Sequence, residues 1–135
     1  MKTAIIFTCA LVCAPAFAQN FTTAAEVKPI LQATKGKWIA VRLWQGQDLL
    51  YFTNLLSWRC GISEISYAVN GGPESVLQME PCYEDTASPN SQKLEDFLPY
   101  IEFEADTISN ISVSVTYDDG ETDSEVYERT SVQIN

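Results

Sequence analysis

The sequence predicts a mostly β fold, an antiparallel β-sandwich of about seven strands with one short N-terminal helix. Two observations carry this prediction. Short segments in which apolar and polar residues alternate recur along the chain, separated by turns rich in glycine, asparagine and aspartate. In addition, two cysteines fall at facing positions of one predicted hairpin. Short strands at this spacing are typical of an immunoglobulin-like arrangement of two sheets.

The first part of the chain has the pattern of a secretory signal peptide over residues 1–18. Lys2 supplies the positive start, residues 4–13 are apolar, and residues 16–18 (Ala-Phe-Ala) provide the small side chains that signal peptidase requires. Cys13 follows the bulky Val12, which argues against a lipid anchor. The sequence therefore predicts an exported protein, periplasmic or extracellular, with a single β-sandwich domain over residues 19–135.

Charge is the most distinctive feature of the composition. The chain has 135 residues, 8 of them basic and 18 acidic, with a net charge of −10 and no histidine. All acidic residues except Glu26 and Asp48 lie in residues 64–135. This balance argues against nucleic acid and anionic membranes as partners, because both require clustered lysine and arginine. No apolar segment after residue 18 is long enough to cross a bilayer, so membrane insertion is not expected.

The domain opens with a helical pattern. Thr23 and Glu26 have the spacing of a capping box, and apolar residues follow at helical intervals. This pattern predicts a short helix that ends near Lys35. Pro29 restricts the helix, which either begins near Lys28 or is kinked there.

Alternation of apolar and polar residues predicts the positions of the strands. The predicted strands are residues 38–44, 49–56, 62–69, 75–81, 100–104, 111–117 and 125–134. The polar stretch 83–98 interrupts this series as a long loop. Within it, Ser88 and Pro89 have the pattern of a helix N-cap and first residue, which predicts one helical turn.

The segment 70–73, Asn-Gly-Gly-Pro, is the clearest turn in the chain and predicts a tight hairpin. If its first glycine is the centre, Ile65 faces Leu77, and extending the ladder places Cys60 opposite Cys82. Neighbouring strands hold facing cysteines within reach of a disulfide. These are also the two cysteines that remain after removal of the signal peptide, and in an oxidising compartment they are expected to pair.

One strand carries a candidate binding site. Trp38, Arg42 and Trp44 alternate with the aliphatic residues at 39, 41 and 43. If the aliphatic face points into the core, the two tryptophans and the arginine point outward, and such residues are the usual anchors of binding interfaces. The alternative is that this strand is covered on both faces, for instance by the leading helix.

The sequence gives little indication of a metal-binding or catalytic site. The acidic segment 118–123 has calcium-binding residue types, but its spacing does not fit an EF-hand, and Asp-Gly is already explained as a turn. Without histidine there is no Ser-His or Cys-His pair, and no glycine-rich phosphate loop is present. We therefore expect no catalytic residues, no cofactor and no metal, although paired carboxylates could still hydrolyse a glycosidic bond.

Three segments carry a resemblance to a known group of proteins. They are residues 48–53 (DLLYFT), 58–61 (WRCG) and 81–87 (PCYEDTA). In these segments the chain resembles a family of small, uncharacterised exported bacterial proteins, and the likeness spans most of the domain. The resemblance implies a location in the bacterial envelope or outside the cell. It implies no activity, ligand or site.

These features together predict a non-enzymatic exported binding module that recognises a protein or a glycan of the cell envelope through an exposed sandwich face. A first alternative is an acidic inhibitor of a basic secreted hydrolase, in which the acidic half of the chain complements a cationic target. A second alternative is a small carboxylate-based hydrolase.

Overall fold

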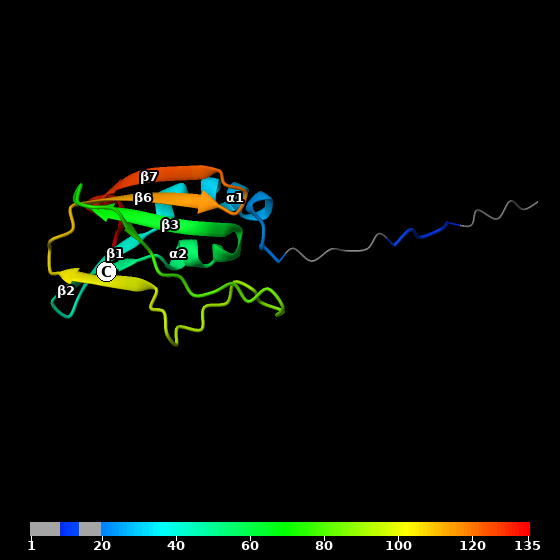
Figure 1. Ribbon diagram of the computed structural model, residues 1–135, viewed down its shortest axis with the longest axis horizontal. Helices are drawn as coiled ribbons and strands as arrows, with labels where there is room; N and C mark the ends of the chain where they lie inside the picture. Colours follow the sequence, from blue (N-terminus) through cyan, green and yellow to red (C-terminus); the bar gives the residue numbers. More distant parts are fainter. Residues whose placement is uncertain (1–8, 14–19) are drawn as a thin grey trace, which may run out of the picture.

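The structure is a computed structural model that describes residues 9–13 and 20–135. The described chain is mostly β, with two four-stranded sheets and few helices (Figure 1). Buried side chains of both sheets belong to one hydrophobic core. The strands described number eight rather than about seven, and an immunoglobulin-like arrangement stays a prediction. The predicted signal peptide, residues 1–18, lies outside the described residues except for 9–13.

The first sheet, here called sheet A, has the strand order β5-β2-β1-β8. Its central strands β1 and β2 form an antiparallel hairpin, β2 pairs antiparallel with β5, and β1 pairs parallel with the short β8. The bounds are Ala40–Trp44 for β1, Gln47–Tyr51 for β2, Tyr100–Glu104 for β5 and Gln133–Ile134 for β8.

The second sheet, sheet B, has the order β4-β3-β6-β7 and is antiparallel throughout. Its strands are Ile62–Val69 (β3), Ser75–Val76 (β4), Asn110–Tyr117 (β6) and Thr122–Glu128 (β7). Along β6 every second side chain is buried, as the alternation in the sequence predicts. The outward residues of β6 are serines and threonine, so this sheet turns a polar face to solvent.

The hairpin of β3 and β4 has the predicted register. Ser66 pairs with Val76, and the amide of Leu77 donates to the carbonyl of Ile65 over 2.8 Å. Cys60 and Cys82 form the predicted disulfide, with their Cα atoms 5.0 Å apart. The second strand is shorter than the predicted 75–81, because regular pairing ends at Val76.

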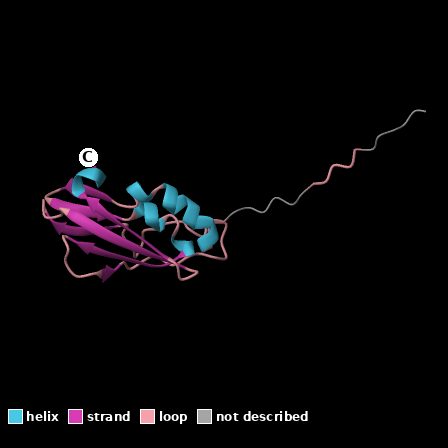
Figure 2. Ribbon diagram, turned by 90° about the horizontal axis from the view of Figure 1, so that it is seen from above, coloured by secondary structure: helices cyan, strands magenta, loops and turns pink. Residues whose placement is uncertain are grey.

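The longest helix, α1 (Ala24–Ala33), lies against the strands (Figure 2). Thr23 caps it by accepting from the amide of Glu26, and Pro29 stands inside it. The expectation of one short N-terminal helix is only partly met, since α1 does not begin the chain and shorter helices accompany it. These are α2 (Thr53–Leu56), α3 (Arg129–Val132) and the 3₁₀ turns η1 (Lys35–Lys37) and η2 (Arg59–Gly61). Within the described ranges, no helix combines the length and apolarity that crossing a bilayer requires.

Gly61 allows α1 to approach η2 closely. A Cβ atom at this position would lie 2.5 Å from Cγ2 of Val27 and 2.7 Å from the carbonyl oxygen of Thr23. Both distances are far below van der Waals contact, so only glycine fits between the helix and the corner that carries Cys60.

Three further predicted segments differ from the structure. The apolar run 49–56 is divided into the end of β2 and helix α2, because a short apolar run does not distinguish a strand from a buried helix. The predicted strand 125–134 is interrupted by α3, where the chain crosses from sheet B to sheet A. At Ser88 there is a hydrogen-bonded turn, closed by the amide of Ser91 over 3.1 Å, rather than a helical turn.

Arg59 holds the long loop 83–98 in place. Its guanidinium is buried and lies beneath the loop, where it donates only to backbone carbonyls. The carbonyls are those of Leu56, Glu80, Pro81, Asn90 and Ser91, at 2.7–3.2 Å. The loop forms no ladder of its own, so these hydrogen bonds satisfy backbone groups that would otherwise be buried without partners.

Asp48 and Arg129 form a buried ion pair that joins the two sheets. Asp48 is fully buried on β2, and both of its oxygens accept from the guanidinium of Arg129, one of them over 2.8 Å. The carboxylate also accepts from the amide of Ile108. The hydrogen bonds from Arg129 outweigh the cost of burial and lower the pKa of Asp48 from 3.8 to about 2.

We expect replacement of Cys60 and Cys82 by serine to lower the melting temperature by roughly 10 °C, because a closed loop of this length contributes about 3 kcal/mol. Limited proteolysis of the double variant should increase within residues 83–98, which leave the hairpin directly after Cys82. Wild type treated with a reductant should behave in the same way. An unchanged melting temperature would show that Arg59 holds this region without the disulfide.

The buried ion pair predicts a pH dependence of stability. Because folding lowers the pKa of Asp48, its contribution of about 2 kcal/mol is fully present above about pH 4 and is lost as the pH falls to about 2. Urea unfolding over this range should therefore show a smaller pH effect for Asp48→Asn than for wild type. Asp85→Asn, on the exposed loop, is the matched control. Parallel pH profiles for wild type and Asp48→Asn would contradict this assignment.

Candidate functional site

The outer face of sheet A brings together aromatic and apolar side chains from four strands. Alternation along β1 places Ala40, Arg42 and Trp44 on the side opposite the fully buried Val41. The strand registers add Tyr51, Tyr100 and Ile134 to the same side, since these residues pair with Ala40, Tyr51 and Arg42 respectively. We call the set Arg42, Trp44, Tyr51, Tyr100 and Ile134 the platform face.

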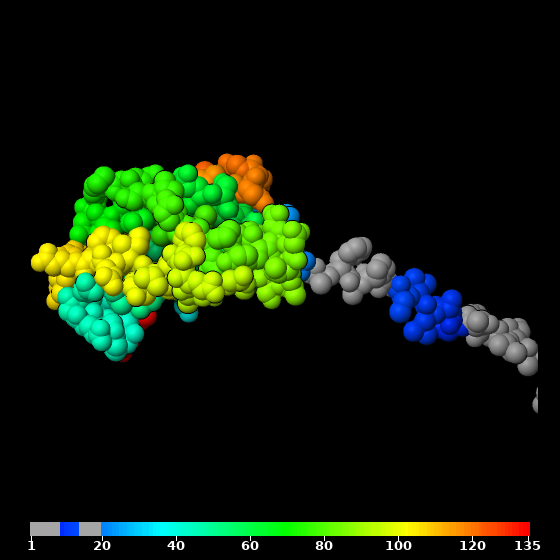
Figure 3. All heavy atoms as spheres, turned by 60° about the horizontal axis from the view of Figure 1, so that its bottom comes forward, coloured from blue at the N-terminus to red at the C-terminus, as the bar shows by residue number. Residues whose placement is uncertain are grey.

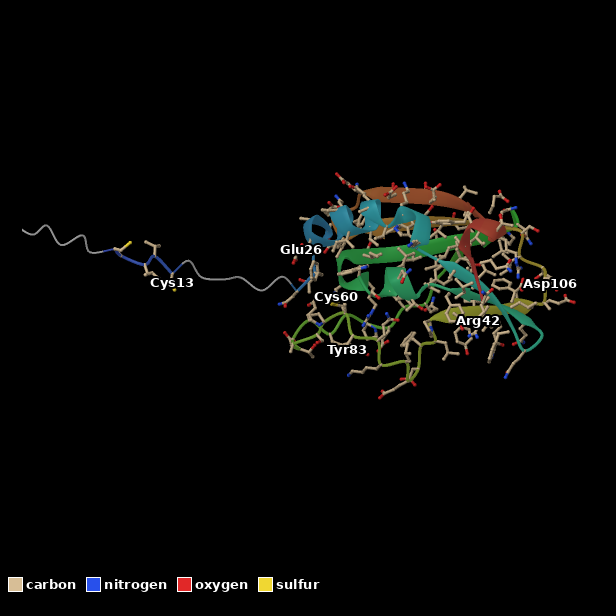
Figure 4. The ribbon with its side chains drawn as sticks, turned by 180° about the vertical axis from the view of Figure 1, so that it is seen from behind. Cys13, Glu26, Arg42, Cys60, Tyr83 and Asp106 are labelled. Atoms are coloured by element: carbon tan, nitrogen blue, oxygen red, sulfur yellow. A yellow bond between two sulfur atoms is a disulfide. The ribbon has the colours of Figure 1, made fainter. Side chains whose placement is uncertain are left out.

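Arg42 and Trp44 form the centre of the platform face. The guanidinium carbon of Arg42 lies 4.0 Å from the centroid of the Trp44 ring, a cation–π contact that orders both side chains. The ring of Trp44 remains 46% exposed, although it is one of the largest apolar side chains. Nε of Arg42 is buried and has no hydrogen-bond partner among the described residues. Figure 4 labels Arg42, which lies at the end of the domain away from Cys60.

The rest of the platform face is apolar and slightly hollowed. The rings of Tyr51 and Tyr100 pack with their centroids 5.2 Å apart, and Ile134 is 48% exposed. A groove of about 290 Å³ runs between β1, the start of α2 and Ile134, and Ala40, Tyr51 and Asn54 line it. A second groove of about 330 Å³ shares Ala40, Asn54 and Ile134 with the first and continues it towards α3.

Trp38, the third residue of the predicted site, lies at the base of the first groove but is not exposed on the platform face. It precedes β1, is fully buried, and its indole N–H donates to the carbonyl of Leu31 in α1 over 2.9 Å. At Trp38 the alternative prediction, that another element covers this face, is therefore correct, because α1 packs over the side chain. Arg42 and Trp44 lie farther along the chain and are not covered by the helix. The structure brings two of the three predicted residues together on an open face.

Tyr51, Tyr100 and Ile134 were not among the predicted site residues. Each belongs to a different strand, and only the strand pairing shows that they share a face with Arg42. The signal in the sequence is weak, since Tyr51 stands in an apolar run and Ile134 next to the last residue.

Acidic residues in the turn after β6 and at the start of β7 form ion pairs with Lys28 of α1 and Lys35 of η1. Asp119 and Glu121 both form ion pairs with Lys28, and Asp123 pairs with Lys35 at 2.5 Å. Asp118 accepts from the amide of Ala24 at the start of α1 over 2.8 Å. The hydrogen bonds to Lys28 lower the pKa of Asp119. These carboxylates therefore serve to attach α1 to sheet B.

Glu80 is the second buried carboxylate, after Asp48. It accepts from the hydroxyl of Tyr83 and from the amide of Lys93, which orders the loop 83–98 (Figure 4 labels Tyr83). Burial opposes ionisation of Glu80, but these hydrogen bonds outweigh it and lower its pKa. A general acid needs a raised pKa, so neither Asp48 nor Glu80 has the property that glycoside hydrolysis requires of its proton donor.

Seven further acidic side chains gather around β5. Exposed carboxylates lie in the loop 83–98, on β5 and in the turn that follows it: Glu84, Asp85, Glu95, Asp96, Glu102, Glu104 and Asp106. Within the described ranges, none of them forms an ion pair with a lysine or arginine. Figure 3 shows this loop and β5, in green and yellow, forming one continuous surface. The uncompensated negative charge therefore borders the platform face along one side.

Comparison with family models, with curated proteins and with solved structures found no match to this chain.

The two tryptophans should respond differently to truncation. We expect Trp38→Ala to cost about 3–5 kcal/mol of unfolding free energy, because it empties a core position. We expect Trp44→Ala, at an exposed position, to cost less than about 1 kcal/mol. Chemical denaturation measures both, and iodide should quench Trp44 fluorescence far more than that of Trp38. Equal destabilisation by the two variants would contradict the different burial of these side chains.

Proposed function

We propose that the protein is a non-enzymatic binding module that recognises a protein or a glycan through the platform face. The exposed stack of Arg42 on Trp44 is the single observation that supports this most strongly. Tryptophan, tyrosine and arginine dominate the energetics of known interfaces, because they combine large contact area with a polar group. Tyr51 and Tyr100 extend the aromatic surface. The two neighbouring grooves are hollows in which a group of the ligand can bind.

We further propose that the protein is exported and acts in the periplasm or outside the cell, after removal of residues 1–18. The disulfide supports this, because such bonds persist mainly in oxidising compartments. Residues 9–13 belong to the segment that we propose is removed, and Leu11 and Val12 within it are each 89% exposed. Phe21, in contrast, is attached to the domain, where its ring packs on Trp58 at 5.0 Å.

A second candidate, an acidic inhibitor of a basic secreted hydrolase, is favoured by a different observation. The unpaired carboxylates around β5 form a surface that would attract and complement a cationic enzyme. This candidate requires inhibition that weakens steeply with ionic strength, since exposed charges are screened by salt.

The platform face can be tested by capture from cell-envelope extract and by binding to a glycan array. We expect wild type to retain a specific ligand and Trp44→Ala to bind it at least about 30-fold more weakly, as truncation of an interface anchor commonly costs 2 kcal/mol or more. Val126→Ala is the matched control, because Val126 is an exposed apolar residue on the outer face of sheet B.

Three outcomes separate the candidates. A protein or glycan whose binding depends on Trp44 but not on Val126 supports the platform face. Ligand binding that both variants retain would place the interface elsewhere on the molecule. Salt-sensitive inhibition of a basic hydrolase that survives Trp44→Ala would favour the inhibitor instead.

A further inference from the structure

The edge of β5 carries backbone groups that are free to pair. The amide of Phe52 donates to the carbonyl of Pro99 over 2.8 Å, just beyond the last paired residues of β2 and β5. In an antiparallel ladder such hydrogen-bonded pairs alternate, so Ile101 and Phe103 direct their N–H and C=O groups towards β2. The amides of Tyr100, Glu102 and Glu104 therefore point away from the sheet, and no described residue accepts from them. Of the carbonyls on the same edge, that of Glu104 already accepts from the amide and hydroxyl of Thr107. Figure 1 shows β5, in yellow, as the outermost strand on its side.

The other long edge is closed by its own side chains. On β7 the amide of Ser124 donates to the carboxylate of Asp123 over 2.9 Å, and the amide of Val126 donates to that of Glu125 over 3.1 Å. The remaining edge strands, β4 and β8, have only two residues each. Among the described strands, β5 thus presents an edge that is both long and open.

An apolar groove lies beside this open edge. It measures about 370 Å³ and separates β5 from the hairpin of sheet B. Its apolar lining comes from both sheets and the loop between them: Tyr67, Val76, Leu77, Phe97, Leu98 and Ile101. A strand added to β5 would direct every second side chain towards this groove and the others towards the outer face. Figure 3 shows the strands and loop that border the groove side by side.

The negative charge along β5 favours an added strand that carries basic side chains. On the outer face, a new strand would lie beside Glu102 and Glu104, which are exposed and have no basic partner among the described residues. Basic side chains at those positions form favourable cross-strand pairs. A second copy of this chain fits poorly, because antiparallel pairing of two β5 edges would bring like charges together in molecules that already carry a net charge of −10.

We propose that β5 is a docking edge for an extended segment of another protein, in which basic and apolar residues alternate and which joins sheet A as an additional strand. The basic side chains pair with Glu102 and Glu104, and the apolar ones occupy the groove. This inference deepens the proposed function, on which it rests for the role of sheet A in recognition, and it selects a protein rather than a glycan as the ligand.

The test uses a capped peptide of about seven alternating lysines and valines, long enough to cover β5. Two control peptides have the same composition with the lysines grouped, or glutamate in place of lysine. We expect only the alternating lysine peptide to bind in isothermal titration calorimetry, with an affinity that falls as salt is added. Amide exchange at Tyr100, Glu102 and Glu104 should slow on binding.

Glu102→Pro removes one outward amide and leaves the ladder to β2 intact, since proline is tolerated at the outward positions of edge strands. We expect it to weaken peptide binding at least about tenfold, because it removes one hydrogen bond to the edge together with the carboxylate that pairs with a peptide lysine. Val126→Pro, on the closed edge of β7, is the matched control and should bind like wild type. The double variant Glu102→Lys with Glu104→Lys keeps the backbone and should prefer the glutamate peptide.

Several results would overturn the proposal. They are equal binding of the alternating and grouped peptides, equal binding by Glu102→Pro and Val126→Pro, or no binding at millimolar peptide, in which case Glu102 and Glu104 serve only to keep the edge soluble. A dimer of the protein that dissociates on Glu102→Pro would assign the edge to self-association instead. Because Trp44→Ala reports on the platform face and Glu102→Pro on the edge, failure of one proposal is distinguishable from failure of the other.

Discussion

The guanidinium of Arg59 lies buried between the corner at η2 and the loop 83–98, and it donates to backbone carbonyls on both sides. A loop of this length without a ladder leaves many backbone acceptors to satisfy. Arg59 satisfies several at once, and the neighbouring disulfide fixes the point at which the loop departs. Asn90 completes the arrangement, because its side chain accepts from the amide of Cys60 and donates to the carbonyl of Phe21. The start of the domain, the corner and the loop therefore depend on one small cluster.

Most of the basic side chains in the described domain form ion pairs or hydrogen bonds with other residues of the same chain. Lys28 attaches α1 to the acidic turn after β6, Lys35 attaches η1 to β7, and Arg129 neutralises Asp48 between the sheets. Arg59 is occupied by backbone carbonyls. Many of the carboxylates left without a basic partner lie around β5 and its preceding loop. The surface charge there follows from how the few cations are distributed within the fold. Electrostatic attraction of a cationic partner would act on this side of the molecule.

The two long sheet edges differ in how they meet solvent. An exposed strand edge invites pairing with other chains, and proteins usually block it with charges, bulges or short strands. The edge of β7 is blocked by Asp123 and Glu125, whose carboxylates accept from the amides that follow them. The edge of β5 has charged side chains but unoccupied amides, and it adjoins both the platform face and the apolar groove. The proposed binding face and the open edge thus both belong to sheet A.

Alternation and turn chemistry determined much of the local structure. The sequence by itself indicated the strands 62–69 and 100–104, the register of the hairpin and the pairing of Cys60 with Cys82, because these depend on neighbours within one supersecondary unit. The division of 49–56 into strand and helix could not be seen, since both states bury the same leucines.

Only the tertiary structure decided what covers each face. Alternation states which side chains share a side of a strand, but it does not state whether another element packs over them. Trp38 and Trp44 have the same place in the pattern, yet α1 buries the first and leaves the second exposed. Likewise, Asp48 stands in an apolar strand and is paired with Arg129 from 81 positions later in the chain. Such contacts depend on chain crossings between the sheets, which no local pattern of residues encodes.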